Sequence, residues 1–309
     1  MRAGPGNDTH PMKHLIAVDW GTSSLRGALL DGDGRVLDEV SAPRGILSVA
    51  GGGFPEVFAR HFDKWRQSHD ASSLICGMAG SRQGWQEAPY CPCPAGLADV
   101  ASRLLWIEPG RIALVPGLSC EEGRVPDVMR GEETQVFGAL HLLGLTDAHL
   151  VLPGTHSKWA QVRDSRVTQF RTYITGEIYA LLRQHSILAR TLPADDGELD
   201  ADAFRQGLAH VRDSTSLLHA VFSVRTLALF ERMPPGVMPS YLSGLVIGEE
   251  LRAQTFTPTA APVLVFGSPA LTARYQLALE WQGVASQAFG SEATWRGLWA
   301  IARQRKEFA

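Results

Sequence analysis

The first regular pattern of the chain is a set of three short apolar runs, at about residues 14–19, 25–31 and 35–40. The letters DGDG separate the last two runs, and Gly and Asp in this position are typical of a hairpin turn. Helical spacing follows over about residues 55–68, with a proline in the first turn. The pattern therefore predicts three strands followed by a helix.

The same order of elements returns about 135 residues later. The stretch AHLVLPGTHSKWAQV predicts a strand, a turn of Gly and hydroxyl residues, and a second strand. SRVTQFRTYI then predicts a third strand and TGEIYALLRQHS a helix, so the repeat lies in the architecture and not in the letters. We predict two similar α/β halves, residues 12–145 and 146–309, with a cleft between them.

The remaining apolar patterns extend this picture. SSLICGMAGS predicts a buried strand that ends in a loop of small residues, and RIALVPG predicts another strand. APVLVFGSPALTARYQLALEWQG predicts a strand, a glycine turn and a helix. Further helices are predicted over residues 200–211, 216–232, 239–254 and 291–305.

Composition narrows the class of protein. Apolar residues make up 45% of the 309 residues, enough for a sizeable core, and 29 basic residues nearly balance 32 acidic ones. This balance gives no electrostatic reason to expect nucleic acid or an anionic membrane as a partner. No apolar run is long enough to span a bilayer, and residues 1–11, which lack an apolar segment, are predicted to be a disordered leader. Cys91 and Cys93 have no second pair for a metal, so we interpret them as loop thiols of a cytoplasmic protein.

The turn after the first strand suggests phosphate chemistry. Asp19 ends the strand, and Gly21, Thr22 and Ser23 follow it. Backbone N–H groups in such turns bind phosphate oxygens, and hydroxyl groups add donors. A carboxylate repels phosphate but can hold a hydrated Mg²⁺ that neutralises it. We therefore predict Asp19 as a metal ligand and the three turn residues as a phosphate site, while a turn without any ligand is the alternative.

A second turn of this kind occupies the same place in the second half. Its letters PGTHSKW supply Gly154, Thr155, His156 and Lys158 as candidate phosphate contacts. His156 is equally well interpreted as a structural histidine. Two such turns resemble the phosphate-binding arrangement of the actin–hexokinase–Hsp70 superfamily, and LVFGSPALTARY resembles its adenosine segment. That resemblance makes Gly267 and Ser268 candidate nucleotide contacts.

Eight strings together carry a closer resemblance. They are DWGTSSLR, GMAGSRQGW, APY, VMRGEETQ, PGTHSKW, FRTYITGE, SGLVIGEE and LTARYQ, in order from about Lys13 to about Ala302. The chain resembles the 2-dehydro-3-deoxygalactonokinase family. This resemblance implies a fold of two ribonuclease H-like domains with a central cleft. It also implies ATP-dependent phosphorylation of 2-dehydro-3-deoxy-D-galactonate to its 6-phosphate in galactonate degradation, with ATP and Mg²⁺.

The resemblance also implies a catalytic base at the start of a helix that ends the first half. MRGEETQVFGALHLLG supplies this helix, with Glu132 and Glu133 as candidates. Successive helical residues point about 100° apart, so both cannot face one atom. Measured from the centre of the apolar stripe, Glu132 lies at about 30° and Glu133 at about 70°. We therefore favour Glu132, with Glu133 close behind.

The substrate of such a kinase is a carboxylate, which an arginine recognises well. Arg26, Arg82 and Arg171 are the candidates, and each has an alternative interpretation as a surface residue. The loop after the buried strand adds further candidate substrate contacts, because ligand loops in α/β folds follow strand ends. They are Ser81, Gly84 and Trp85, of which Trp85 can equally be a core residue.

Several alternatives remain at this point. A kinase of the same fold could act on another keto-deoxy sugar acid, such as 2-dehydro-3-deoxy-D-gluconate. A chaperone-like protein would need a large additional domain, and an inactive sugar sensor would lack Asp19 and Glu132. The small-molecule sugar acid is therefore the expected partner, and the oligomeric state is left open, a homodimer included.

Overall fold

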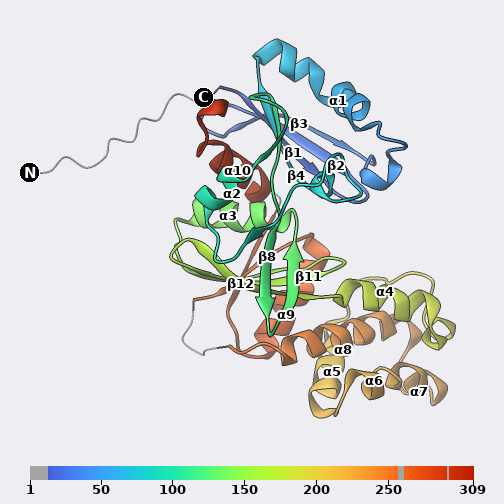
Figure 1. Cartoon of the computed structure of the whole chain (residues 1–309). Helices are drawn as coiled ribbons and strands as arrows, with labels where there is room; N and C mark the ends of the chain where they lie inside the picture. The colour runs from blue at the N-terminus through green and yellow to red at the C-terminus, as the bar shows by residue number, and fades with distance from the viewer. Residues whose placement is uncertain (1–12, 257–260, 291) are drawn as a thin grey trace, which may run out of the picture. The chain divides into compact units, whose positions relative to one another are not determined.

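The computed structural model describes residues 13–256, 261–290 and 292–309, so the predicted leader of residues 1–11 lies outside the described residues. The chain divides into two compact units (Figure 1). The first unit runs up to Asp147 and includes Gln161–Phe170 and the carboxy-terminal helix. The second unit consists of Ala148–Ala160 and Arg171–Gly290.

A six-stranded sheet forms the centre of the first unit. In the order in which they pair, the strands are β3 (Val36–Ala42), β2 (Leu25–Leu30), β1 (Leu15–Trp20), β4 (Ser72–Gly77), β7 (Ile112–Leu114) and β6 (Leu105–Glu108). β1 pairs antiparallel with β2 and parallel with β4. The hairpin of β2 and β3 turns through the predicted DGDG letters, where Gly34 has a φ of +78°. The three opening strands are therefore confirmed.

Helix α1 (Phe54–His69) covers this sheet with a row of aromatic side chains. Phe58 and Phe62 are fully buried and belong to the same apolar cluster as Trp20. Gly27 on β2 makes room for this helix, because a Cβ atom there would lie 2.3 Å from the Phe62 ring. Close packing of this kind fixes the strand ends that carry the candidate site.

A second group of elements completes the first unit. It contains a three-stranded sheet, β5 (Cys91–Pro92), β8 (Leu118–Glu122) and β9 (Val125–Met129), which the sequence patterns did not predict. It also contains the helices α2 (Leu97–Ser102), α3 (Glu132–Leu143) and α10 (Glu292–Ala302). α3 and α10 approach very closely, because a Cβ atom at Gly138 or Gly297 would collide with the backbone of the facing helix.

A five-stranded sheet forms the centre of the second unit. The strands pair in the order β12 (Arg166–Tyr173), β11 (Ser157–Arg163), β10 (Ala148–Leu152), β13 (Val263–Phe266) and β14 (Ser286–Phe289). β10 and β13 are parallel, as β1 and β4 are in the first unit. The order β12-β11-β10-β13 thus repeats the order β3-β2-β1-β4. The predicted architectural repeat and the α/β class are confirmed.

The second unit also contains a group of helices (Figure 1). They are α4 (Thr175–His185), α5 (Ala201–Asp213), α6 (Leu217–Ala220), α7 (Ser223–Leu229), α8 (Met238–Arg252) and α9 (Pro269–Trp281). α5 and α8 pack with their backbones in contact, since a Cβ atom at Gly244 would lie 2.1 Å from the Phe204 carbonyl oxygen. The single helix predicted over 216–232 is wrong: α6 and α7 are two short helices that break at Val221–Phe222.

The observed division of the chain differs from the predicted halves in two segments. Gln161–Phe170, the tip of the β11–β12 hairpin, and the segment that contains α10 both cluster with the first unit. The reason for α10 is its close contact with α3, which periodicity along the chain does not reveal. In the part of the chain that the structure describes, no helix combines the length and apolar character that crossing a bilayer requires.

Candidate active site

The first unit places Asp19 at the carboxyl end of β1, as predicted. Its neighbour in the hairpin register is Arg26, and the Arg26 guanidinium donates to Asp19 Oδ2 at 2.5 Å. The Asp19 side chain is 18% exposed, so one of its oxygen atoms can still face solvent or a ligand. Arg26 is therefore paired with Asp19 in this structure and is not available to bind a substrate carboxylate.

The turn after β1 is tight and partly self-satisfied. The Gly21 N–H donates to the Ser24 carbonyl at 2.9 Å, so this amide is used within the turn. Thr22 and Ser23 are exposed and keep their hydroxyl groups at the surface. Of the three predicted phosphate contacts, the two hydroxyl residues thus have the accessibility that the role requires.

The loop after β4 is packed more tightly than a surface loop. Gly84 is enclosed, because a Cβ atom there would lie 2.3 Å from the Met78 and Ala79 carbonyl oxygens. Trp85 stacks on Phe54 with a ring separation of 6.5 Å and belongs to the core, in line with the second interpretation of this residue. Ser81 Oγ is buried without a hydrogen-bond partner, so it is an unused polar group of this loop.

Arg82 points away from the loop. Its side chain is 87% exposed and pairs only loosely with Glu87, at 3.5 Å. The third candidate arginine, Arg171, is exposed and belongs to the second unit. The structure therefore does not gather the predicted arginines around one point of the first unit.

Helix α3 begins beside the ends of β1 and β4. Gly131, which precedes the helix, has a φ of +107°, and a Cβ atom there would lie 3.2 Å from Gly77 Cα at the end of β4. Glu132 accepts a hydrogen bond from the Arg130 N–H at 2.9 Å, and Glu133 accepts one from the Gly131 N–H at 2.7 Å. Both candidate bases therefore sit in the first turn of the helix, where the helix dipole favours negative charge.

The two carboxyl groups differ sharply in environment. Glu132 is partly exposed, whereas Glu133 is completely buried. The angles to the apolar stripe predicted that Glu132 faces inward more than Glu133 does. The structure shows the opposite, because β4 and α10 lie against the part of the unit that contains Glu133. Burial, followed by the nearby Glu132 carboxylate, raises the pKa of Glu133 to about 8. At neutral pH, Glu133 is therefore mostly protonated.

Arg130 connects this turn to the loop after β4. Its guanidinium donates to the Ala88 carbonyl at 2.7 Å and lies 4.3 Å from the centre of the Tyr90 ring. A Cβ atom at Gly80 would come within 2.9 Å of the same guanidinium, so the loop closes directly over it. The sequence analysis missed this residue, although it stands in the quoted string VMRGEETQ.

The second unit places the other predicted turn at the end of β10. Gly154 is partly exposed, and Thr155 and His156 are exposed. The turn is held by the start of α4: the Glu177 N–H donates to the Thr155 carbonyl at 3.0 Å, and the Glu177 carboxylate lies 2.7 Å from His156 Nε2. His156 is therefore anchored by a side chain, while Lys158 lies on β11 and is only 6% exposed.

A buried carboxylate below this turn joins four elements. Glu250 of α8 accepts hydrogen bonds from Ser157 Oγ at 2.9 Å, Trp159 Nε1 at 2.6 Å and the Tyr275 hydroxyl at 2.8 Å. Thr175 Oγ1, at the start of α4, also donates to it. Burial raises the pKa of Glu250, and the four donors oppose this change. The network connects the turn, α4, α8 and α9 through one acceptor.

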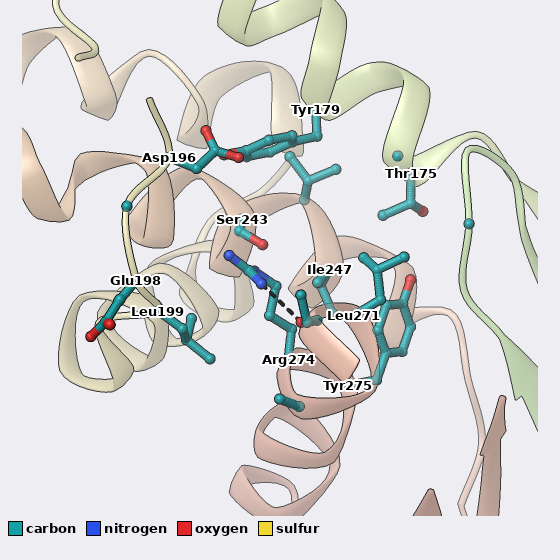
Figure 2. A pocket seen from close by; sticks show the side chains of 16 residues that line it. Thr175, Tyr179, Asp196, Glu198, Leu199, Ser243, Ile247, Leu271, Arg274 and Tyr275 are labelled. Atoms are coloured by element: carbon teal, nitrogen blue, oxygen red, sulfur yellow. Dashed lines mark hydrogen bonds between the residues drawn. The ribbon is translucent and has the colours of Figure 1, made fainter. Parts of the chain in front are cut away.

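A cavity of about 540 Å³ opens beside this network (Figure 2). Gly154 and Thr175 connect it to the turn, and Val246, Ile247 and Leu271 give it apolar walls. Its lining is mostly apolar with a few polar side chains, as in many sites for aromatic ligands. Gly267 and Ser268 lie at the end of β13, immediately before the helix that forms one wall.

Polar side chains also line the cavity. Figure 2 shows Tyr179 and Asp196 on one side and Arg274 and Tyr275 on another. The Arg274 guanidinium donates to the Ala270 carbonyl at 2.8 Å, one turn earlier in α9. The sequence analysis did not identify these residues, since they come from segments that only the fold brings together.

The metal prediction rests on Asp19 alone. Within the described ranges, no group of three or more His, Cys, Asp and Glu side chains could hold a metal ion. Cys91 and Cys93 carry free thiols whose pKa is raised by burial. The prediction that both lie in a loop is wrong for Cys91, because it belongs to β5 and pairs with β8.

Comparison with known proteins identifies the family. Residues 19–301 match the family of 2-keto-3-deoxy-galactonokinases. The chain belongs to this family. It is 39% identical over 297 residues to a Rhizobium meliloti protein named 2-dehydro-3-deoxygalactonokinase, an alignment that covers 94% of this chain and 97% of the relative. It is 32% identical over 289 residues to the 2-dehydro-3-deoxygalactonokinase of Escherichia coli, covering 93% of this chain and 97% of the relative.

A solved structure of the family supports the fold. The crystal structure of a Sinorhizobium meliloti protein described as a 2-dehydro-3-deoxygalactonokinase matches this chain with a TM-score of 0.86 at 36% identity. The match covers 94% of this chain and 98% of the other. The resemblance read from eight short strings is therefore confirmed, and the chain is a sugar-acid kinase by family.

Proposed function

We propose that the protein transfers the terminal phosphoryl group of ATP to the terminal hydroxyl of 2-dehydro-3-deoxy-D-galactonate, which yields the 6-phosphate. Family membership over residues 19–301 is the observation that carries this proposal. Because the cytoplasm supplies ATP, we propose it as the place of the reaction.

Glu132 is the proposed base. A base must come within hydrogen-bonding distance of the hydroxyl that it deprotonates. Glu132 is partly exposed at the start of α3, whereas no part of Glu133 reaches the surface. The Arg130 N–H donates to one oxygen of Glu132 and holds this carboxylate at the start of α3. Phosphoryl transfer depends mainly on positioning and on charge stabilisation, so a fixed carboxylate with this access suits the reaction.

The proposed substrate contacts of the first unit lie in the loop after β4. Ser81 has an unused hydroxyl group, and Gly84 lets the loop fold tightly beside it. Arg82 is exposed and has only a loose partner, so it remains available for the substrate carboxylate. Arg171 and Arg26 are weaker proposals for this role, the latter because it is paired with Asp19.

The nucleotide contacts are proposed for two turns and a cavity. Thr22 and Ser23 in the first unit and Gly154, Thr155, His156 and Lys158 in the second offer donors for phosphate oxygens. Gly267 and Ser268 precede α9, which forms one wall of the cavity. This cavity has the size and the apolar walls that suit an adenosine. Glu198 lines this cavity and carries oxygen atoms that can accept hydrogen bonds from ribose hydroxyls, whereas Asp196 is paired with Arg183.

Asp19 fits a magnesium ion of the kind that kinases use. Mg²⁺ commonly keeps several water ligands and takes one or two carboxylates together with phosphate oxygens, so a single carboxylate at a strand end suffices. The Arg26 guanidinium holds the Asp19 carboxylate in place. A bound Mg²⁺ would neutralise the charge of the phosphates during transfer.

A coupled ADP-release assay tests the proposal. Purified protein is given ATP, Mg²⁺ and one of four acceptors: 2-dehydro-3-deoxy-D-galactonate, its gluconate epimer, the corresponding sugar acid without the keto group, and glucose. The proposal expects the highest kcat/KM for the galactonate derivative. A higher value for the gluconate epimer would change the substrate within the same class, and turnover of glucose alone would refute the sugar-acid assignment.

A further inference from the structure

The Glu133 carboxyl group lies at the proposed active site, but the proposed reaction assigns no role to it. Its carboxyl group is completely enclosed at the start of α3, and the adjacent Glu132 is the residue with access to a substrate. Glu133 Oε2 accepts the Gly131 N–H at 2.7 Å, while Oε1 has no hydrogen-bond partner among the residues that the structure describes. An enclosed carboxyl group is costly to bury, so a role beyond packing is expected.

The contacts of Glu133 concentrate on the turn that presents Glu132. Gly131 adopts a φ of +107°, which disfavours any residue with a side chain, and it packs on Gly77. The Thr134 hydroxyl donates to the Gly131 carbonyl at 2.5 Å, in the peptide unit that follows Gly131. Glu133 and Thr134 therefore hold both polar groups of Gly131, and the Arg130 guanidinium fastens the preceding residue to Ala88.

We propose that Glu133 is a positioning residue whose carboxyl group fixes the turn at Gly131 and thereby holds the Glu132 carboxylate toward the substrate. This inference rests on the proposed role of Glu132 as the base. It assigns no contact with the reacting atoms to Glu133, because the side chain has no access to them.

The charge state of Glu133 makes the proposal measurable. Burial and the Glu132 carboxylate raise its pKa to about 8, and Arg130 opposes this change. Below this pH the side chain is a neutral acid and leaves Glu132 as the only negative charge of the turn. Above it, a second negative charge appears one residue from the base, and like charges at this distance disfavour each other.

The other titratable groups on the elements packed around the start of α3 include Cys76, Asp19, Arg26, Arg296 and the exposed Glu292, and Arg303 follows α10. The Cys76 thiol is neutral because burial raises its pKa well above the ordinary value. Asp19 is paired with Arg26. Arg296 of α10 and Arg303, just after this helix, act on His141, which lies in the last turn of α3, while Glu133 lies in the first. Glu133 is therefore the group at this turn that is expected to change charge near pH 8.

The experiment compares the dependence of kcat on pH in the full-length wild type, Glu133→Gln, Glu133→Ala and Glu132→Gln. Wild type should lose activity above about pH 8. Glu133→Gln keeps a neutral carboxamide that can accept the Gly131 N–H, so it should lose this alkaline decline. Glu133→Ala removes the acceptor and should lower kcat at every pH. Glu132→Gln should lower kcat on the order of 10²-fold or more, as expected for a base.

A second measurement follows Glu133 without turnover. The infrared carbonyl band of a protonated carboxylic acid, identified by its loss in Glu133→Gln, should titrate near pH 8 in the wild type. The proposal is overturned if Glu133→Gln retains the alkaline decline, or if it lowers kcat at pH 7 as much as Glu132→Gln does. It is also overturned if no such band is present at pH 7. If the infrared titration is found but Glu132→Gln is fully active, the base assignment fails and the buried neutral acid stands.

Discussion

Replacing Glu250 tests whether one buried carboxylate organises the second unit. Glu250→Gln keeps the shape of the side chain but turns one acceptor oxygen into a donor. Trp159 Nε1 can only donate, so the amide oxygen must take the Oε1 position beside Trp159 and Ser157. The amide nitrogen then faces the Thr175 and Tyr275 hydroxyls, which have to turn their hydrogen atoms elsewhere.

The magnitude follows from the number of hydrogen bonds that change. A hydrogen bond to a charged group is worth roughly 1.5–3 kcal/mol and a neutral one about 1 kcal/mol, so weakening two of the four bonds and rearranging the other two costs at least about 2 kcal/mol. Part of this cost is returned, because a neutral amide is easier to bury than a carboxylate. Glu250→Ala leaves four donors without their acceptor and should cost about 4 kcal/mol or more.

Urea unfolding followed by circular dichroism gives the free energy of unfolding for each variant. Glu249→Gln is the matched control, because the neighbouring Glu249 is partly exposed and pairs with Arg252 on the same helix. A surface pair three residues apart on a helix is worth about 0.3–0.5 kcal/mol, so this control should change little. Isothermal titration with a non-hydrolysable ATP analogue should show weaker binding for Glu250→Gln, since Thr175 and Tyr275 also line the cavity.

The reasoning is refuted if Glu250→Gln destabilises the protein no more than Glu249→Gln does. It is also refuted if Glu250→Ala and Glu250→Gln cost the same, because the argument depends on the acceptor that the amide retains. Unchanged nucleotide binding alongside the predicted loss of stability would confine the network to a structural role.

Three further predictions concern separate parts of the site. The folded-state pKa of Glu133 lies above its ordinary value of 4.5, so the free energy of unfolding of the wild type should fall by roughly 1.4 kcal/mol per pH unit between about pH 4.5 and about pH 8. Equal pH slopes for wild type and Glu133→Gln in urea unfolding would contradict this. Asp19→Asn should lower kcat on the order of 10²-fold while circular dichroism shows an intact fold. The control Asp33→Asn, at an exposed ion pair, should keep a kcat near that of the wild type, and comparable kcat values for the two variants would remove Asp19 from the site. Leu271→Trp should narrow the cavity and raise the KM for ATP several-fold without changing the KM for the sugar acid, and an increase in the second KM alone would place the nucleotide elsewhere.

The sequence by itself determined those features that depend on neighbours along the chain. Apolar runs and DGDG predicted β1, β2 and β3 because strand alternation and turn chemistry are local. The same logic located Asp19 and the Gly154 turn at strand ends and revealed that the order of strands repeats. Eight short strings were then enough to recognise the family, because each string is a local pattern that can be seen directly in the sequence.

The tertiary structure decided everything that depends on residues far apart in the chain. Ser157 and Tyr275 meet at Glu250 although 118 residues separate them, and no pattern within either segment records that contact. The angles of a single helix placed Glu132 on the inward side, but the neighbours of α3 bury Glu133 instead. Burial is a property of the elements that pack around a helix, and it sets the pKa and the access of each carboxyl group. The sequence therefore supplied the candidate residues, and the packing assigned them different chemical states.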